Sequence, residues 1–276
     1  MSTGAGSQHR ESTATDGALH FGLEGRRRYA FFQAGEGASA DLPAILIVPP
    51  IGPDAERQHR AMRQLAAHAA RQGMPSLRFD FLGHGDSDLA SREACWTDWE
   101  EDVALAQIEL ASRTPGRAVA VVAFGLGALA AQRALSTKTL WAFVLVDAPV
   151  DGRAWWEELD RSQRDLVRRS SARWPEASDE APVERLGFEF DRRVVESITT
   201  TRCGDSGPWT TRLLVAATAA EPPAAAWVGS IEAAAHAKAT ILHHPWPAGL
   251  DDDPFKPRVP QPLIQALLSA FRGGSK

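Results

Sequence analysis

The sequence predicts an α/β fold in which a mostly parallel, doubly wound sheet forms one domain that carries a helical insertion. Short apolar segments alternate along the chain with helical patterns, as strands and crossover helices do in such folds. The apolar segments are continuous, which is typical of strands covered on both faces. With 276 residues and 44% hydrophobic composition, the chain is long enough to bury one large core.

Seven segments are expected to form the strands, because they are short and rich in β-branched or aromatic residues. They are RYAFFQ (28–33), AILIVPP (44–50), SLRFDF (76–81), AVAVVAF (118–124), LWAFVLVDAP (140–149), RLLVAAT (212–218) and ATILHH (239–244).

Three other segments have apolar residues at helical spacing, and we expect these stripes to face the core. The stripes are Met62, Leu65, Ala66 and Ala69; Trp99, Val103, Ala106 and Leu110; and Leu263, Ile264, Leu267, Leu268 and Phe271. Thr97 and Glu100 have the spacing of a capping box, which predicts the start of the second helix.

Two regions differ from this pattern. Residues 1–20 are predicted to be a flexible N-terminal tail, because they lack the large apolar residues whose burial offsets the entropy of ordering. Residues 21–276 form the expected single domain, and about residues 151–210 are a charged, helical insertion that contains Trp155 and Trp156. We interpret the insertion as a lid over the carboxyl ends of the strands, where ligands bind. The tryptophans are candidate ligand contacts or, alternatively, anchors of the lid itself.

Composition and charge exclude several classes of function. The net charge of −5 and the absence of a dense basic run make nucleic acid an unexpected partner. No apolar run reaches the ~20 residues of a membrane span, and the first residues lack a signal peptide pattern, so we expect a cytoplasmic protein without membrane insertion. Cys95 and Cys203 form no C-x-x-C pair, which favours reduced, structural thiols. The sequence contains no phosphate loop, dinucleotide fingerprint or metal-ligand spacing, so neither a cofactor nor a metal is expected.

The segment VAVVAFGLGALAAQRAL (119–135) has the pattern of a nucleophile elbow, which is a buried strand, a glycine-bracketed turn and a helix. The motif G-x-S-x-G places a serine at its centre. This chain has Gly125 at that position and Ala123 in place of the first glycine. It therefore lacks the hydroxyl that would attack an acyl substrate.

A second segment, RFDFLGHGDS (78–87), matches a D-x-x-G-x-G-x-S turn whose aspartates are expected to hold backbone amides. With this turn, the elbow and a late strand bearing histidines, the chain resembles the α/β-hydrolase superfamily over about residues 28–272. Within it, the chain is similar to the second type of hydrolase-like proteins associated with exosortase A systems. The matching segments are VPPIGPDAERQHRAM (48–62), LRFDFLGHGDSD (77–88), ACWTDWEEDV (94–103), DAPVDGRAWWEE (147–158), RLGFEFDRRVVESI (185–198) and DPFKPRVPQPLIQALL (253–268).

This resemblance implies an α/β-hydrolase fold, a role near surface-polysaccharide or protein-sorting loci, and a group whose elbow often lacks serine. It also implies positions for the rest of a triad. The acid should follow the seventh strand, where Glu221 is the acid available, and the histidine should follow the eighth strand, as His244 or alternatively His243. A Glu221–His244 dyad is one interpretation, and a solvated glutamate with a packed histidine pair is the other.

An anion-binding pocket is expected beside Gly125. The loop after the third strand would supply the amides of Ile51 and Gly52, and the helix after the elbow would supply those of Leu126 and Gly127. Candidates to rim the same pocket, or else surface residues, are Asp54, Arg57, His59 and Arg60.

These features predict a catalytically degenerate hydrolase homologue that binds a small molecule, an acyl group or a partner protein in the old cleft. It would be an accessory protein of an envelope, exopolysaccharide or secondary-metabolite pathway. The alternative is an atypical enzyme such as a lyase or cyclase, in which His244, oriented by Glu221, acts as a general base while amides hold an oxyanion. A third interpretation is interaction with a partner protein through the lid, and a serine-independent hydrolase is the least favoured.

Overall fold

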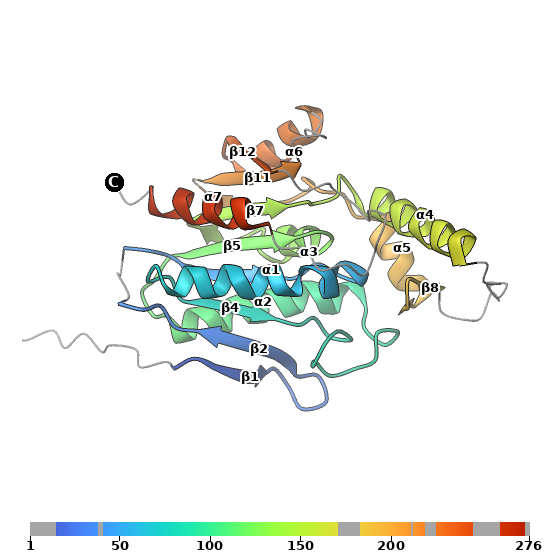
Figure 1. The fold of residues 1–276 in the computed structure, drawn as a ribbon, viewed down its shortest axis with the longest axis horizontal. Helices are drawn as coiled ribbons and strands as arrows, with labels where there is room; N and C mark the ends of the chain where they lie inside the picture. The colour runs from blue at the N-terminus through green and yellow to red at the C-terminus, as the bar shows by residue number, and fades with distance from the viewer. Residues whose placement is uncertain are drawn as a thin grey trace, which may run out of the picture.

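The computed structural model describes residues 15–37, 41–170, 183–210, 212–218, 225–244 and 260–273. An eight-stranded sheet forms its centre and runs from β1 at the bottom of Figure 1 to β12 at the top. In spatial order the strands are β1 (Gly17–Phe21), β2 (Arg28–Gln33), β4 (Ser76–Phe79), β3 (Ala44–Val48), β5 (Val119–Phe124), β7 (Ala142–Val146), β11 (Leu213–Thr218) and β12 (Ala239–His244).

The sheet is parallel over most of its width and antiparallel at one edge. β3 pairs in parallel with both β4 and β5, and β7, β11 and β12 continue the parallel register. β2 pairs antiparallel with β1 and with β4. Each of the seven predicted segments contains one strand of this sheet, and the prediction of a mostly parallel α/β fold is confirmed.

Helices cover both faces of the sheet (Figure 1). α1 (Pro53–Ala70) and α7 (Gln261–Arg272) bury their apolar residues in one core cluster, and α2 (Trp96–Arg113) and α3 (Gly127–Ala134) bury theirs in the other. α6 (Ala225–Ala235) lies near the far edge, between β11 and β12 in sequence. Every residue of the three predicted apolar stripes is buried, and full burial of a large apolar side chain stabilises the fold by about 1.5–3 kcal/mol.

The predicted tail extends too far along the chain. Gly17–Phe21 form β1, which pairs with β2 so that Gly17 faces Phe32 and Phe21 faces Arg28. Leu19 and Phe21 pack against the core, so two apolar residues at alternate positions suffice for an edge strand when the next strand supplies the hydrogen bonds. The strand was not predicted because its apolar residues alternate with the exposed Ala18 and His20. Residues 1–14 lie outside the described residues.

The second helix begins before the predicted capping box. Cys95 is the N-cap of α2: its thiol accepts the amide of Asp98, and the Asp98 carboxylate accepts the Cys95 N–H at 2.9 Å. Thr97 lies inside the helix, where its hydroxyl is 3.1 Å from the Cys95 thiol, and Glu100 pairs with Arg133. The prediction was wrong because cysteine is not among the preferred N-cap residues, so the box was placed on the nearest threonine.

Of the two aspartates expected to hold backbone amides in the turn after β4, Asp80 does so, because its carboxylate accepts the N–H of Asp86 at 3.2 Å. Asp86 takes part through its main chain and is exposed. A Cβ on Gly85, which has φ +52, would overlap the Asp80 carboxylate, so the turn requires glycine there. The hydroxyl of Ser87 donates to the carbonyl oxygen of Asp80 at 2.7 Å and accepts the N–H of Tyr29 at 2.9 Å.

Three consecutive arginines connect the β1–β2 edge to the rest of the domain. Arg26 pairs with Asp98, Arg27 with Asp88, and Arg28 with Asp102. The innermost pair is buried: Nε of Arg28 lies 2.5 Å from Oδ1 of Asp102, whose other oxygen accepts the N–H of Leu82 at 2.8 Å. The antiparallel edge is thereby bonded to α2 and to the turn after β4.

The predicted insertion consists of α4 (Gly152–Ser170), a hairpin of β8 (Val183–Arg185) and β9 (Phe188–Phe190), α5 (Arg192–Thr200) and the short β10 (Trp209–Thr210). β10 pairs with β6 (Thr139–Leu140). α4, α5 and β8 lie beyond the arrowheads of β5 and β7 (Figure 1). The insertion therefore stands at the carboxyl ends of the central strands, the end at which open α/β sheets bind ligands.

Candidate functional site

The backbone of the elbow is present. Only Gly125 and Leu126 lie between β5 and α3. Gly125 has φ +49, a value that strains residues with a side chain, and its N–H donates to the carbonyl oxygen of Val146 at 2.9 Å. A Cβ on Gly127 would overlap the carbonyl oxygen of Pro49. The start of α3 and the loop after β3 are therefore so close together that only glycine fits at position 127.

Pro50 fills the space in which a nucleophile side chain would begin. An ideal Cβ on Gly125 would lie 3.0 Å from the Cβ of Pro50, whereas carbon atoms in good contact are about 3.5–4.0 Å apart. The pyrrolidine ring is closed onto its own backbone, so it cannot rotate away as an open side chain would. A side chain at position 125 would therefore require Pro50 to shift by a few tenths of an ångström.

The amides expected to receive an anion differ in their availability. Leu126 and Gly127 stand at the N-terminus of α3, where the first N–H groups have no intrahelical acceptor. Ile51 is fully buried. The N–H of Gly52 donates to Nε2 of His84 at 3.2 Å, so in this structure that amide is engaged within the protein.

His84, in the turn after β4, is held in one neutral tautomer. Its Nδ1 lies 3.2 Å from the carbonyl oxygen of Leu82, which can only accept, so Nδ1 carries the proton and Nε2 accepts from Gly52. Burial against the rings of Trp99 and Phe188 lowers the pKa of His84 to about 4, and the bond to Leu82 opposes this only in part. The imidazole bridges this turn to the loop after β3.

Aromatic residues of the insertion pack over the same loop. The rings of Phe190 and Trp155 come within 3.4 and 3.5 Å of the place where a Cβ on Gly52 would lie. Trp155, Trp156 and Phe190 contact one another with centroids 5.5–6.3 Å apart. Phe188 stacks on the imidazole at 6.1 Å. Both tryptophans anchor the insertion in this structure, and a ligand contact by either one stays a prediction.

The structure does not test the predicted dyad, because Glu221 and the side chain of His244 lie outside the described residues. His243, the alternative base, is exposed near the end of β12. Its main chain pairs with that of Ala217 on β11. The Glu221–His244 dyad accordingly stays a prediction.

The candidate rim residues on α1 divide into two groups. Arg57 is buried, with 1% of its side chain exposed, and its Nη1 lies 3.4 Å from Oδ1 of Asp54. His59 and Arg60 are exposed, and His59 lines a cavity beside Pro50. The burial of Arg57 contradicts the expectation of a surface residue, and its place at the rim of the anion pocket stays a prediction.

Sequence reasoning missed Asp147 in addition to His84. Asp147 directly follows β7, the neighbour of the elbow strand, and has φ +48. Its N–H donates to the carbonyl oxygen of Ala216 on β11 at 3.2 Å. The sequence could have indicated Asp147 as a candidate, because an acid directly after a continuous apolar strand lies at the carboxyl edge of a parallel sheet, where ligands bind.

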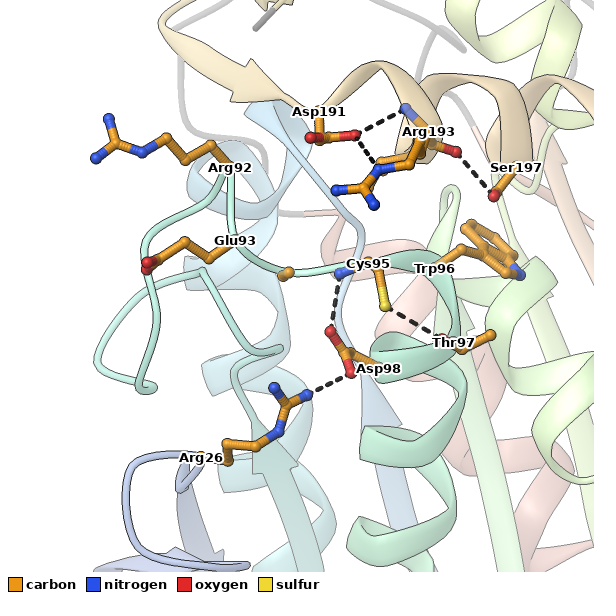
Figure 2. Close-up of a pocket in the computed structure, with 12 residues that line it drawn as sticks. Arg26, Arg92, Glu93, Cys95, Trp96, Thr97, Asp98, Asp191, Arg193 and Ser197 are labelled. Atoms are coloured by element: carbon orange, nitrogen blue, oxygen red, sulfur yellow. Dashed lines mark hydrogen bonds and ion pairs between the residues drawn. The ribbon is translucent and has the colours of Figure 1, made fainter.

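Two cavities flank the turn after β4. The smaller, of about 230 Å³, is lined by Pro49, Pro50, the first turns of α1, the turn itself and Phe188. The larger, of about 410 Å³, lies between the N-termini of α2 and α5, and Figure 2 shows Cys95 and several arginines at its wall. The arginines at that wall are paired with carboxylates: Arg26 with Asp98, Arg92 with Glu189 and Arg193 with Asp191. The larger cavity therefore has little uncompensated charge with which to select an ion.

The described ranges contain no group of three or more His, Cys, Asp or Glu residues placed to hold a metal ion. No helix among them is both long enough and apolar enough to cross a membrane. Both cysteines are free, Cys95 exposed and Cys203 buried.

Comparisons with known proteins agree with this geometry. A family model described as "Alpha/beta hydrolase family" matches residues 45–275. No curated protein sequence showed significant similarity. Among solved structures, Est1E of Butyrivibrio proteoclasticus with bound ferulic acid has a TM-score of 0.63 at 14% identity, covering 93% of this chain and 98% of its own. An esterase of Pyrococcus furiosus has a TM-score of 0.62 at 12% identity (98% and 94% covered). A Xanthomonas campestris serine hydrolase, described as lacking a lid, has a TM-score of 0.57 at 16% identity, and the match covers 94% of each chain.

Proposed function

The chain belongs to the alpha/beta hydrolase family, and we propose that it is a member that has lost acyl-enzyme chemistry and binds a small molecule or acyl group in the former active-site cleft. One observation carries the proposal: position 125 bears no side chain, and Pro50 stands 3.0 Å from where that side chain would begin. A missing hydroxyl alone could be restored by one substitution. The close approach of Pro50 supports a loop that has also adapted to the absence of that side chain.

The energetic consequence is large. Removing the nucleophile of a serine triad leaves only ~10³ to 10⁴ of rate enhancement over water, from binding and from the oxyanion amides. This chain retains the backbone amides that bind the oxyanion in such a site. The amides of Leu126 and Gly127 at the start of α3 favour a carboxylate, phosphate or carbonyl oxygen at the elbow.

A second candidate function rests on the same retained amides. An enzyme that abstracts a proton beside a carbonyl needs an oxyanion site and a base, but no nucleophile. The left-handed backbone at Gly125 and the start of α3 support the first requirement. The base would be His244 with Glu221, and this half of the hypothesis stays a prediction. A cytoplasmic location and an accessory role in envelope, exopolysaccharide or secondary-metabolite synthesis rest on the sequence resemblance alone.

The loss of the nucleophile is tested with a fluorophosphonate probe, which labels activated serines. We expect no labelling of the wild-type protein and no hydrolysis of p-nitrophenyl acetate above a denatured control. Gly125→Ser alone should also stay unlabelled, because its side chain would meet Pro50. Gly125→Ala is the matched control for the strain of a side chain at φ +49. Stoichiometric labelling of a serine or cysteine in the wild type would overturn the proposal.

The double variant Gly125→Ser/Pro50→Gly tests the second candidate function. It restores both the hydroxyl and the space for it. Labelling of this variant would mean that a functional base stands over the elbow, as the enzyme hypothesis requires. An unlabelled but folded double variant would favour the binding function, whose ligand would be detected by native mass spectrometry as a mass released on denaturation.

A further inference from the structure

The 230 Å³ cavity beside Pro50 has a wall that is mainly aromatic and apolar. Phe81 and Phe188 contribute rings, and Pro49 and Pro50 contribute the side that continues to the elbow. Phe188 stacks on the imidazole of His84, which also lines the cavity. A water molecule occupies about 30 Å³ in the liquid, so the volume of the cavity equals that of roughly eight water molecules. A compact ligand with one aromatic or aliphatic body fits this space.

The charged groups at the cavity are carboxylates. Glu56, Asp80 and Asp86 line it, and none of the lining residues that the structure describes is a lysine or an arginine. Arg63 and Arg78 lie close enough to influence His59 but stand outside the lining. The guanidinium group of Arg78 is instead placed 4.8 Å above the ring of Phe31. The ligand that complements this wall carries a positive charge.

His59 does not supply that charge itself. Partial burial, followed by the nearby Arg78 guanidinium, lowers the pKa of His59, so its imidazole is neutral at pH 7 and can accept a hydrogen bond. Burial also raises the pKa of Asp80, and the N–H of Asp86 compensates only in part. A carboxylate that has lost solvation in this way gains most from a cation placed against it.

We propose that this cavity binds a small organic ammonium ion, that is, an amine with a compact apolar body held by the carboxylates and by the faces of Phe81 and Phe188. Aromatic faces attract ammonium groups within about 6 Å of the ring centroid, and carboxylates accept charge-assisted hydrogen bonds from them. The inference goes beyond the proposed function, because Gly125, Leu126 and Gly127 do not line this cavity and their amides belong to a separate site at the elbow.

The experiment compares three probes of equal size and different charge: benzylamine, benzyl alcohol and benzoate. Binding to the full chain is measured by calorimetry at pH 7.5 and low salt, and the site is located by NMR shifts of the Gly85 and Phe188 amides. We expect benzylamine to bind at least about tenfold more tightly than benzyl alcohol, which corresponds to one charge-assisted contact. We expect no binding of benzoate at this cavity, so benzoate should leave the Gly85 and Phe188 amide signals unshifted.

Variants assign the interaction to the cavity. Asp86 and Glu56 are exposed, so Asp86→Asn and Glu56→Gln should fold, and each should weaken benzylamine binding several-fold. Glu157→Gln, an exposed carboxylate on α4, is the matched control and should leave binding unchanged. Phe188→Leu should weaken benzylamine and benzyl alcohol alike.

Three results would overturn the inference: equal affinity for all three probes, tighter binding of benzoate, or shifts that map to the cavity beside Cys95. Failure to bind benzylamine at millimolar concentration would do the same. None of these results changes the expected lack of fluorophosphonate labelling, so the inference and the proposed function fail separately.

Discussion

Replacement of His84 by phenylalanine should reduce the acid sensitivity of the fold. The imidazole has a pKa of about 4 in the folded protein and near 6.5 when exposed, and each pKa unit corresponds to about 1.4 kcal/mol. Because the folded pKa is lowered, the unfolded chain binds the proton more readily. The free energy of unfolding therefore falls as the pH decreases from about 6.5 to about 4, by about 3 kcal/mol in total from this residue.

His84→Phe keeps an aromatic ring between Trp99 and Phe188 but cannot be protonated. At pH 7.5 it should cost about 1–3 kcal/mol, because the N–H of Gly52 loses its acceptor. The deficit should shrink and disappear as the pH approaches 4, where the wild type has lost its own contribution from the neutral imidazole. Carboxylates contribute to acid unfolding in both proteins, so their effect cancels in the difference between the two.

The assay is urea unfolding followed by tryptophan fluorescence at a series of pH values between 4 and 8. The chain has nine tryptophans, and Trp99 lies 5.7 Å from the His84 ring. His20→Phe, at an exposed position in β1, controls for the loss of a histidine. Parallel pH profiles of wild type and His84→Phe would refute the reasoning, as would an imidazole ¹⁵N signal that titrates near pH 6.5.

Two further substitutions test the packing that positions the site. Gly127→Ala should destabilise the protein by more than about 3 kcal/mol in denaturant unfolding, because its Cβ would overlap a backbone carbonyl; Gly229→Ala in α6, where the Cβ meets open space, should be neutral or stabilise by up to about 1 kcal/mol. Arg28→Met should cost about 3–5 kcal/mol by leaving the Asp102 carboxylate buried and unpaired, whereas Arg26→Met, at a half-exposed pair, should cost at most about 1 kcal/mol. Equal losses within either pair would contradict the burial argument.

The sequence was sufficient for the fold because the strongest signals were local. β5 could be predicted from six consecutive apolar residues, and the elbow from the glycines that follow them. β1 could not be predicted, because only Leu19 and Phe21 pack against the core and the strand depends on its hydrogen bonds with β2. The start of α2 at Cys95 was missed for a related reason: a thiol can cap a helix, but its rarity there gives no signal.

The site was less predictable because its decisive contacts join distant segments. Pro50 and Gly125 are 75 positions apart, and nothing in either segment alone indicates that their β-carbons would compete for one space. His84 was not selected because it lies in a glycine-rich turn that was already interpreted as structural. Its hydrogen bond with Gly52 depends on the tertiary fold and leaves no pattern in the sequence. The Glu221–His244 dyad stays a prediction from the sequence resemblance.

The three arginine–aspartate pairs of the β1–β2 edge also constrain how the chain emerges during synthesis. The arginines are separated from their partners by 61 to 74 residues. At ~5–20 residues per second, a ribosome needs roughly 3 to 15 s to deliver the aspartates after the arginines have been made. A β1–β2 hairpin that formed within that interval would have an open edge, and we expect its three adjacent positive charges to repel other chains. The arginines that form ion pairs in the folded protein would then limit aggregation of this edge until α2 has been translated.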